Sequence, residues 1–259
     1  MKIAIFGLGV VGGTLARWLE TSTTHTLLKV DPALGLQDDI TGAECAFVCV
    51  PAATLSDRSQ DLSAIEQILE KLPNRLIPVF LKSTVLPGTT DMLSEKYHLT
   101  IYHMPEFLTE RTRDADFKVH DILVGCAWHE SQEKMFQTDF IRAIFPGKRI
   151  IPVTNTEAEL VKYAHNCFGA VKVNYFNMIY ELCQALDCDY ENVRRGVLLS
   201  GLIESTHTEV PGPDGKFGFG GKCLPKDLKA MIGLTREQWV SNDILFSTEG
   251  ENERRRKKA

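Results

Sequence analysis

Near its start the chain reads Lys2-Ile3-Ala4-Ile5-Phe6-Gly7-Leu8-Gly9-Val10-Val11-Gly12, an apolar run followed at once by three spaced glycines. The apolar run predicts a buried parallel strand, and residues 14–20 have helical spacing. Between a strand and a helix, Gly7 permits a tight turn, Gly9 permits close approach of a pyrophosphate, and Gly12 permits close helix–strand packing. The stretch therefore predicts a dinucleotide-binding turn.

A second apolar run, at residues 26–30, ends at Asp31. An acidic side chain at this point can accept hydrogen bonds from the adenosine ribose and repels a 2′-phosphate. Asp31 therefore favours NAD over NADP as the cofactor. The alternative is that Asp31 only caps a turn with Pro32.

Strand-like and helical segments alternate over the next hundred residues. The expected strands are 45–50, 75–81, 99–103 and 121–125, and the expected helices are 61–72 and 87–96. This alternation predicts an α/β fold with an open, doubly wound parallel sheet, which binds ligands at the carboxyl ends of its strands. The residues at those ends include Lys82, Ser83, Thr84, Pro105 and Glu106.

The pattern becomes helical from about residue 157 and continues so for some thirty residues, with a further helix expected at 189–199. A loop rich in Gly, Pro and Ser then runs over residues 200–221. We expect residues 1–154 to form the sheet domain and residues 155–259 to form a smaller, all-helical domain.

The loop leads into Gly218-Phe219-Gly220-Gly221-Lys222-Cys223-Leu224-Pro225-Lys226-Asp227. Pro225 permits a helix to begin near the cysteine, because its missing N–H costs nothing in the first turn. A thiol at a helix N-terminus with lysines nearby is a candidate nucleophile. The alternative is an inert, half-buried cysteine after a glycine-rich loop.

Composition limits the partners and the compartment. The net charge of −5 gives no reason to expect nucleic acid, and we expect the basic tail at 249–259 to be a solvated helix end. Seven scattered cysteines indicate reduced thiols in the cytoplasm rather than a disulfide framework. No apolar run is long enough to cross a membrane, and we expect no metal site.

Together the motifs resemble the UDP-glucose/GDP-mannose dehydrogenase family, the NAD-dependent nucleotide-sugar 6-dehydrogenases. The matching pieces, in the family's order, are Gly7-Leu-Gly-Val-Val-Gly12, Val50-Pro51, Lys82-Ser-Thr-Val85, Pro105-Glu-Phe-Leu108, Lys162-x-x-x-Asn166, Asn177 and Gly218-Phe-Gly-Gly-Lys-Cys-Leu-Pro-Lys-Asp227. The resemblance implies an N-terminal Rossmann domain that binds NAD, followed by a helical domain that carries homodimer contacts.

The resemblance also implies roles for individual residues. The catalytic residues would be Cys223, Lys162, Asn166, Glu106, Asp227 and Thr84. The cofactor would contact Gly7, Gly9, Val10, Val11, Gly12, Asp31, Val50, Pro51, Ser83, Thr84 and Lys226. The substrate would contact Glu106, Phe107, Leu108, Lys162, Asn166, Gly220 and His207.

The chain departs from the family pattern where the substrate is recognised. Members of the family usually carry a further Rossmann-like domain that holds the nucleotide diphosphate, so this chain resembles a short form. His207 and Arg111 replace an Arg and a Gly of the family, Lys222 stands for a Ser, and Ala52 stands for a Thr. These departures leave the sugar-derived substrate open.

Three functions of different kinds follow from the sequence. The first is a four-electron oxidation of a primary alcohol to a carboxylate through a thiohemiacetal and a thioester on Cys223. The second is a two-electron dehydrogenase of the hydroxyacid or phosphogluconate type, in which Cys223 is structural. The third is a non-catalytic NAD-binding half of a split enzyme, whose nucleotide-binding subunit is a separate polypeptide.

Overall fold

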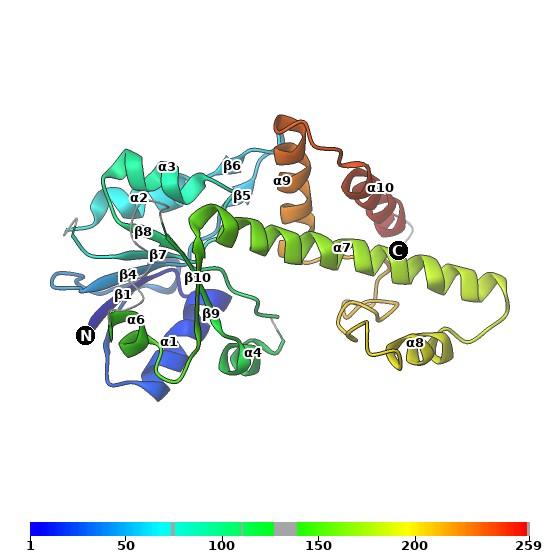
Figure 1. Ribbon diagram of the computed structural model, residues 1–259, viewed down its shortest axis with the longest axis horizontal. Coiled ribbons are helices and arrows are strands. Elements are labelled where there is room, and N and C mark those ends of the chain that lie inside the picture. Colours follow the sequence, from blue (N-terminus) through cyan, green and yellow to red (C-terminus); the bar gives the residue numbers. More distant parts are fainter. Residues whose placement is uncertain (74–75, 110, 127–138, 258–259) are drawn as a thin grey trace. The chain divides into compact units, whose positions relative to one another are not determined.

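The computed structural model describes residues 1–73, 76–109, 111–126 and 139–257 (Figure 1). The chain forms two compact units: Met1–Ala53 with Gln60–Lys162, and Thr54–Ser59 with Tyr163–Ala259. The domain boundary expected after residue 154 falls where helix α7 (Asn155–Ala185) begins. The two compact units part later, within that helix.

The first unit contains a six-stranded sheet in the order β3-β2-β1-β4-β7-β8. Its parallel strands are β1 (Lys2–Phe6), β2 (Thr26–Asp31), β4 (Cys45–Val48), β7 (Val79–Leu81) and β8 (Ile101–His103). Short β3 (Leu36–Gln37) pairs antiparallel with β2 at the edge. A second parallel pair joins β9 (Ile122–Cys126) to β10 (Ile150–Thr154), and two-residue β5 (Ala53–Thr54) pairs with β6 (Gln60–Asp61).

Helices cover both faces of the sheet, as Figure 1 shows. They are α1 (Val10–Ser22), α2 (Ser63–Lys71), α3 (Thr89–Tyr97), α4 (Arg113–Val119) and α6 (Asp139–Ile144). Alternate residues of β1 point to opposite faces. Ile3 and Ile5 pack with Leu15 of α1 in one core, whereas Ala4 packs with Ile65 of α2 in the other. The expected doubly wound parallel sheet is confirmed.

Some element boundaries differ from those expected. The strand expected at 45–50 stops at Val48, two residues before Val50-Pro51, where proline has no N–H for the ladder. The strand expected at 75–81 is limited to Val79–Leu81, and its predicted start at Arg75 lies outside the described residues.

The second unit is helical, as expected. It contains most of α7, then α8 (Tyr190–Leu198), α9 (Cys223–Glu237) and α10 (Asp243–Lys257). Asp189 caps α8 by accepting a hydrogen bond from the Glu191 amide. Among the described helices, none has the length and hydropathy that a bilayer crossing requires.

The short segment Thr54–Ser59 also belongs to the second unit. Thr54 Oγ1 donates to the Lys226 carbonyl at 3.1 Å. Arg58 forms a two-pronged ion pair with Glu249 of α10, with N–O distances of 3.1 and 2.7 Å, and Nη1 also donates to the Lys229 carbonyl. The segment is therefore anchored to both α9 and α10.

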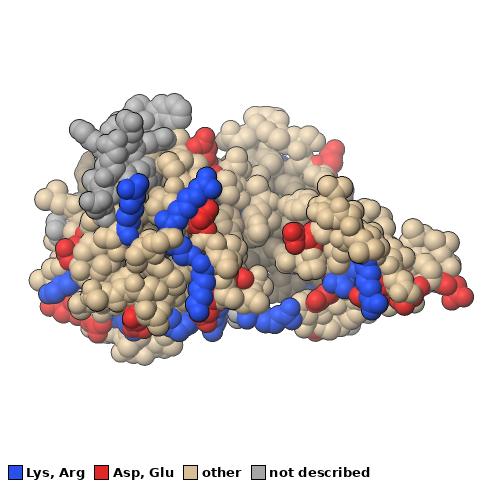
Figure 2. All heavy atoms as spheres, turned by 60° about the horizontal axis from the view of Figure 1, so that its bottom comes forward, with Lys and Arg blue, Asp and Glu red and all other residues tan. Residues whose placement is uncertain are grey.

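The basic tail differs from the expected solvated helix end. Arg254 is exposed, but Arg255 is only 5% exposed and pairs with Glu181 of α7 at 3.2 Å. Arg256 pairs with Asp214. The last two residues of the tail lie outside the described range. On the face drawn in Figure 2, Lys and Arg lie among Asp and Glu rather than in one continuous patch.

Candidate active site

The glycine-rich turn between β1 and α1 has the geometry that its sequence predicts. Gly7 has a φ of +81°, and a Cβ there would lie 2.9 Å from the Cys49 carbonyl oxygen. A Cβ on Gly12 would lie 1.9 Å from the Gly7 carbonyl oxygen. At Gly9, by contrast, none of the described atoms would come within 4 Å of an added Cβ. The backbone is therefore open to a ligand at Gly9 and closely packed at the other two positions.

The N-terminus of α1 begins at Val10 and Val11, directly after Gly9. Within the described ranges, no side chain caps this helix end. Free amide groups at a helix N-terminus bind phosphate oxygens. The turn therefore fits the pyrophosphate of a dinucleotide.

Asp31 lies at the carboxyl end of β2, beside the same turn. Its Oδ2 accepts a hydrogen bond from the Leu8 amide at 2.7 Å, and its Oδ1 accepts one from the Ala33 amide at 3.1 Å. The bond to Ala33 is the turn cap that the sequence offered as the alternative. The bond to Leu8 also ties the carboxylate to the glycine-rich turn.

Ser83, which follows β7, hydrogen-bonds to the segment that follows β4. Its hydroxyl is buried and donates to the Val50 carbonyl at 2.6 Å, next to Pro51. Thr84 follows, half-buried, and its carbonyl accepts from Gln60 at 3.2 Å. These residues form part of the sheet edge at which ligands of such folds bind.

Glu106 and Lys162 form a mostly buried ion pair. Lys162 Nζ lies 3.1 Å from Glu106 Oε1 and 2.5 Å from the Glu106 carbonyl oxygen. The side chains of Lys162 and Glu106 are 6% and 11% exposed. The ammonium also lies 5.8 Å from the ring centre of Phe107. The structure thus brings together three of the residues that the sequence singled out.

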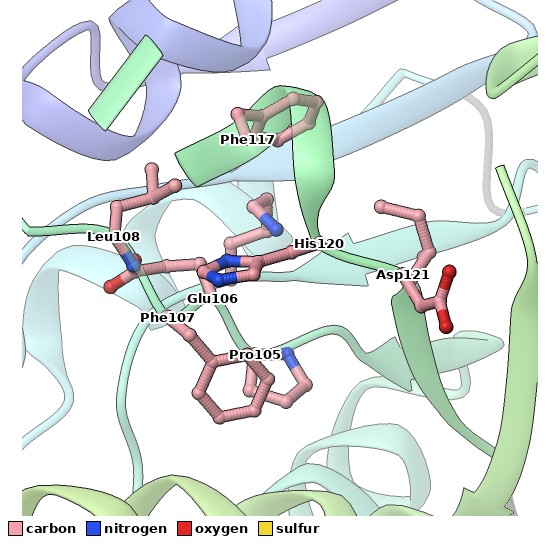
Figure 3. A pocket seen from close by; sticks show the side chains of 9 residues that line it. Pro105, Glu106, Phe107, Leu108, Phe117, His120 and Asp121 are labelled. Carbon is pink, nitrogen blue, oxygen red and sulfur yellow. The ribbon is translucent and has the colours of Figure 1, made fainter. Parts of the chain in front are cut away.

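A pocket with an empty volume of about 280 Å³, part of it open to solvent, lies beside Glu106 (Figure 3). It is lined by Lys82, Pro105, Glu106, Phe107, Leu108, Phe117, His120, Asp121 and Ile122. His120 stands edge-on to Phe107, with ring centres 6.2 Å apart. Its Nδ1 atom is buried and has no hydrogen-bond partner within the part of the chain that is described.

Sequence reasoning placed Lys82 at a strand end without a role, and it missed His103. Lys82 is 4% exposed, its Nζ donates to the Met104 carbonyl at 3.1 Å, and burial lowers its pKa. Burial raises the pKa of the neighbouring Cys49 thiol to about 12. Burial, with the charges of Lys82 and Lys162, lowers the pKa of His103 to about 3. Buried basic side chains therefore cluster near Glu106, and burial favours the neutral forms of Lys82 and His103.

Glu159 is a second buried group that the sequence did not single out. Its carboxylate accepts hydrogen bonds from the Gly88 amide at 2.6 Å, the Thr90 amide at 2.7 Å and the Thr90 hydroxyl at 2.6 Å. It thereby caps the N-terminus of α3. Burial raises the pKa of Glu159 to about 7, although these hydrogen bonds oppose the shift.

In the second unit, Cys223 is the first residue of α9 and is exposed. One turn further, Asp227 is 1% exposed and accepts from Asn166 Nδ2 at 2.6 Å and from Lys226 Nζ at 2.5 Å. Asn166 lies one helical turn after Lys162 in α7. The structure therefore groups Asn166, Lys226 and Asp227 at the helix that the cysteine begins.

His207 and Gly220 have protein neighbours of their own. His207 has a φ of +66°, and its ring approaches α7 closely at Gly169, where a Cβ would lie 3.0 Å from Cε1. Burial, followed by the charge of Lys172, lowers the pKa of His207. A Cβ on Gly220 would lie 2.8 Å from Arg256 Nη2.

The predicted residues thus fall into two groups. Those from Gly7 to Lys162 belong to the first unit, and Asn166, His207, Gly220, Cys223, Lys226 and Asp227 belong to the second. No set of three His, Cys, Asp or Glu residues suited to a metal ion occurs among the described residues.

The fold and the glycine-rich turn define an NAD-binding Rossmann protein with an attached helical unit. The family models give the family. Residues 33–140 match the NAD binding domain of the UDP-glucose/GDP-mannose dehydrogenase family, and residues 156–254 match its central domain. The chain belongs to the UDP-glucose/GDP-mannose dehydrogenase family.

Individual relatives are consistent with this assignment. The chain is 31% identical over 238 residues to a UDP-glucose 6-dehydrogenase of Pseudomonas aeruginosa, covering 85% of this chain and 51% of that protein. The chain therefore spans about half the length of the curated relatives it matches.

Solved structures match the fold over nearly the whole chain. A UDP-glucose dehydrogenase of Pyrobaculum islandicum has a TM-score of 0.81 at 24% identity, covering 97% of this chain and 68% of that one. A 3-hydroxyisobutyrate dehydrogenase of Mycobacterium tuberculosis has a TM-score of 0.72 at 16% identity, covering 96% of this chain and 91% of that one. At these identities the likeness shows the fold alone.

Proposed function

We propose that the chain carries out the NAD-dependent oxidation of a nucleotide sugar, in which a primary alcohol becomes a carboxylate. The observation that carries the proposal is the setting of Cys223, whose exposed thiol begins α9 one turn before the buried Asp227. Family membership supports the same chemistry. The names of the relatives favour UDP-glucose as the substrate.

Most of the residues that we assign to the cofactor belong to the first unit. The open backbone at Gly9, the uncapped end of α1 and the carboxylate of Asp31 suit a pyrophosphate and a ribose. The other residues proposed to contact it are Gly7, Val10, Val11, Gly12, Val50, Pro51, Ser83, Thr84 and Lys226. When bound, NAD accepts the hydride that leaves the substrate carbon.

We assign Lys162 and Asn166 to the substrate oxygen. They lie four residues apart in α7 and so share one helix face. An ammonium and an amide both donate hydrogen bonds to an oxygen that becomes negatively charged in a transition state. The first oxidation gives an aldehyde. The remaining proposed substrate contacts are Phe107, Leu108, Gly220 and His207.

Cys223 then bonds to the aldehyde carbon through its sulfur, and the carbonyl oxygen takes up a proton. The resulting thiohemiacetal carries the hydride that the aldehyde could not readily give. Loss of this hydride from carbon and of the proton from the hydroxyl oxygen leaves a thioester. Glu106 removes a proton from a water that Thr84 and Asp227 help to hold; the water oxygen bonds to the thioester carbon, and the thiolate leaves as the carboxylate forms.

The stoichiometry of the reaction tests this mechanism. We expect two NADH for each UDP-glucose consumed, measured by absorbance and product chromatography. Cys223→Ala should block the second oxidation while NAD still binds, because no thiohemiacetal can form. Glu106→Gln should slow thioester hydrolysis, so that a covalent acyl-enzyme accumulates and is seen by intact-protein mass spectrometry.

Cys188→Ala is the matched control, since Cys188 is also exposed. It should retain two NADH per substrate. A ratio of one for the unaltered protein on a substrate that it turns over well would remove Cys223 from the mechanism. That result would favour the two-electron alternative.

We further propose that two copies pair through α7. Phe168, Tyr175, Met178 and Leu182 are 68%, 52%, 47% and 50% exposed and follow a heptad-like spacing. The opposite side of the helix already packs against its own unit through Ala170, Val173 and Phe176. A helix apolar on two sides indicates a partner for its exposed side, which we call the α7 stripe.

A cytoplasmic location is part of the same proposal. All seven cysteines lie in the described part of the chain, and there they are thiols rather than members of a disulfide. Cysteines kept as thiols suit a reducing compartment.

A further inference from the structure

The loop that precedes Cys223 is held by side chains from two helices. Gly218 N–H donates to Asn177 Oδ1 of α7 at 2.9 Å, and Phe219 N–H donates to Asn252 Oδ1 of α10 at 2.7 Å. Arg256 of α10 donates to both carbonyls, with Nε 3.1 Å from the Phe219 oxygen and Nη2 3.2 Å from the Gly218 oxygen. The backbone N–H and C=O groups of Gly218 and Phe219 are thus all hydrogen-bonded to side chains.

The glycines of the loop fit the same arrangement. A Cβ on Gly218 would lie 2.4 Å from Asn252 Oδ1, and Gly218 has a φ of +72°. A Cβ on Gly220 would meet Arg256 at 2.8 Å. The side chains of α10 therefore occupy the space that larger residues at these loop positions would need. Glycine at positions 218 and 220 therefore allows the loop backbone to lie close to α10.

Helix α10 is itself fixed to the second unit. Asn174 of α7 donates to the Thr248 carbonyl at 2.7 Å, and Arg255 pairs with Glu181 of α7 at 3.2 Å. Arg256 Nη1 also donates to Asp214 Oδ2 at 2.6 Å. Phe219 packs its buried ring beside Leu228 and Ile232 of α9. Phe219, four residues before Cys223, is therefore held both by its backbone and by its side chain.

We propose that Asn252 and Arg256 are positioning residues for Cys223. The catalytic role of Cys223 itself rests on the proposed function. They fix the two peptides at Gly218 and Phe219, and these peptides set where the first turn of α9 begins. A thiolate at that turn is stabilised by the helix N-terminus only while the turn is formed. Releasing the loop should therefore weaken the nucleophile.

The test measures Cys223 directly in the full chain, without substrate. Iodoacetamide labelling at pH 7, quantified by peptide mass spectrometry, gives the rate at Cys223, with Cys188 in the same sample as an internal reference. Arg256→Met should slow labelling of Cys223 relative to Cys188 by about two- to fivefold, the loss of a helix-terminus interaction. Hydrogen exchange at the Phe219 amide should become faster, because its local structure opens more often.

Matched variants separate positioning from general damage. Arg254→Met removes a neighbouring guanidinium that pairs only with Glu181 and Glu251 in the contacts described, and it should change neither measurement. Asn252→Leu should act like Arg256→Met, whereas Asn252→Asp keeps an acceptor for Phe219 N–H and should behave like the unaltered protein. Circular dichroism confirms that each variant is folded.

The proposal is overturned if Arg256→Met and Arg254→Met give equal labelling ratios, or if labelling of Cys223 becomes faster. It is also overturned if Asn252→Asp is as impaired as Asn252→Leu. Neither measurement needs turnover. A ratio of one NADH per substrate would thus refute the proposed function while leaving the positioning of Cys223 unaffected, and the reverse also holds.

Discussion

Asp31 is the residue on which we expect the choice between NAD and NADP to depend. Its carboxylate lies beside the glycine-rich turn, bonded to the Leu8 amide. A 2′-phosphate there would be repelled, which should weaken NADP relative to NAD by about 2 kcal/mol. Titration of both dinucleotides by tryptophan fluorescence measures the difference.

The effect should follow the charge of Asp31. Asp31→Asn should bring the two affinities to within about tenfold, since about 1.4 kcal/mol corresponds to one factor of ten. Asp38→Asn is the control, because Asp38 also accepts a backbone hydrogen bond, from Lys29 at 2.8 Å, but follows the strand β3. Equal affinities for the two cofactors in the unaltered protein would contradict the assignment.

Glu159 makes stability depend on pH. Its pKa is about 7 in the folded protein, against an ordinary 4.5, so between these values the folded state holds more protons than the unfolded state. The free energy of unfolding must then fall as pH rises through this range. The Glu159→Gln variant lacks this titration. The free energy of unfolding of the unaltered protein, minus that of the variant, should therefore fall by about 3 kcal/mol between pH 4.5 and about 8.

Urea unfolding at a series of pH values measures this difference. Glu157→Gln provides the control from the same helix turn, because hydrogen bonds from Thr154 lower the pKa of Glu157. The Glu157 variant should not show the same decline. A difference for Glu159→Gln that stays constant across the range would show that the carboxyl is not protonated on folding.

At the scale of elements, α7 packs within its own unit on one side and exposes the α7 stripe on the other. Phe168→Glu combined with Leu182→Glu places charges in the α7 stripe, where pairing would bury them without counter-charges. The double variant should sediment as a monomer in analytical ultracentrifugation, while the unaltered chain sediments as a dimer.

The control for this change is Leu76→Glu. Leu76 is 91% exposed and lies in the first unit, so a glutamate there should leave the dimer intact. An unaltered chain that is monomeric at tens of micromolar, or a double variant that still forms dimers, would refute pairing through the α7 stripe.

Helix α10 illustrates what element-level patterns miss. The tail at 249–259 is strongly charged, so the sequence favoured a solvated helix end. The structure instead uses its polar side chains as partners for residues far away in the chain, such as Asn252 with Phe219 and Arg255 with Glu181. Such contacts depend on tertiary position, and no local period encodes them.

For the whole molecule, the parallel sheet and the glycine-rich turn could be predicted because they depend on local order. Gly7, Gly9 and Gly12 each have the surroundings that their spacing predicts. Glu159 could not be predicted, because a glutamate in a helix normally faces water. Its burial depends on α3, whose amide groups and Thr90 hydroxyl give it three hydrogen bonds.

The candidate site likewise contains residues that motifs revealed and residues that they did not. Glu106, Lys162, Asn166 and Asp227 were named from motifs, and the structure pairs Glu106 with Lys162 and Asn166 with Asp227. The motifs said nothing of what supports the cysteine loop, because Asn252 and Arg256 lie in a segment that reads as a tail.

The anchored segment Thr54–Ser59 has a consequence for how this protein can be dissected. The chain passes between the two units after Ala53, after Ser59 and again after Lys162. A single cut in the gene at residue 154 would leave Glu249 on one fragment and Arg58 on the other. Because the two units interleave in the sequence, dividing the coding sequence at any single codon leaves at least one unit without part of its residues.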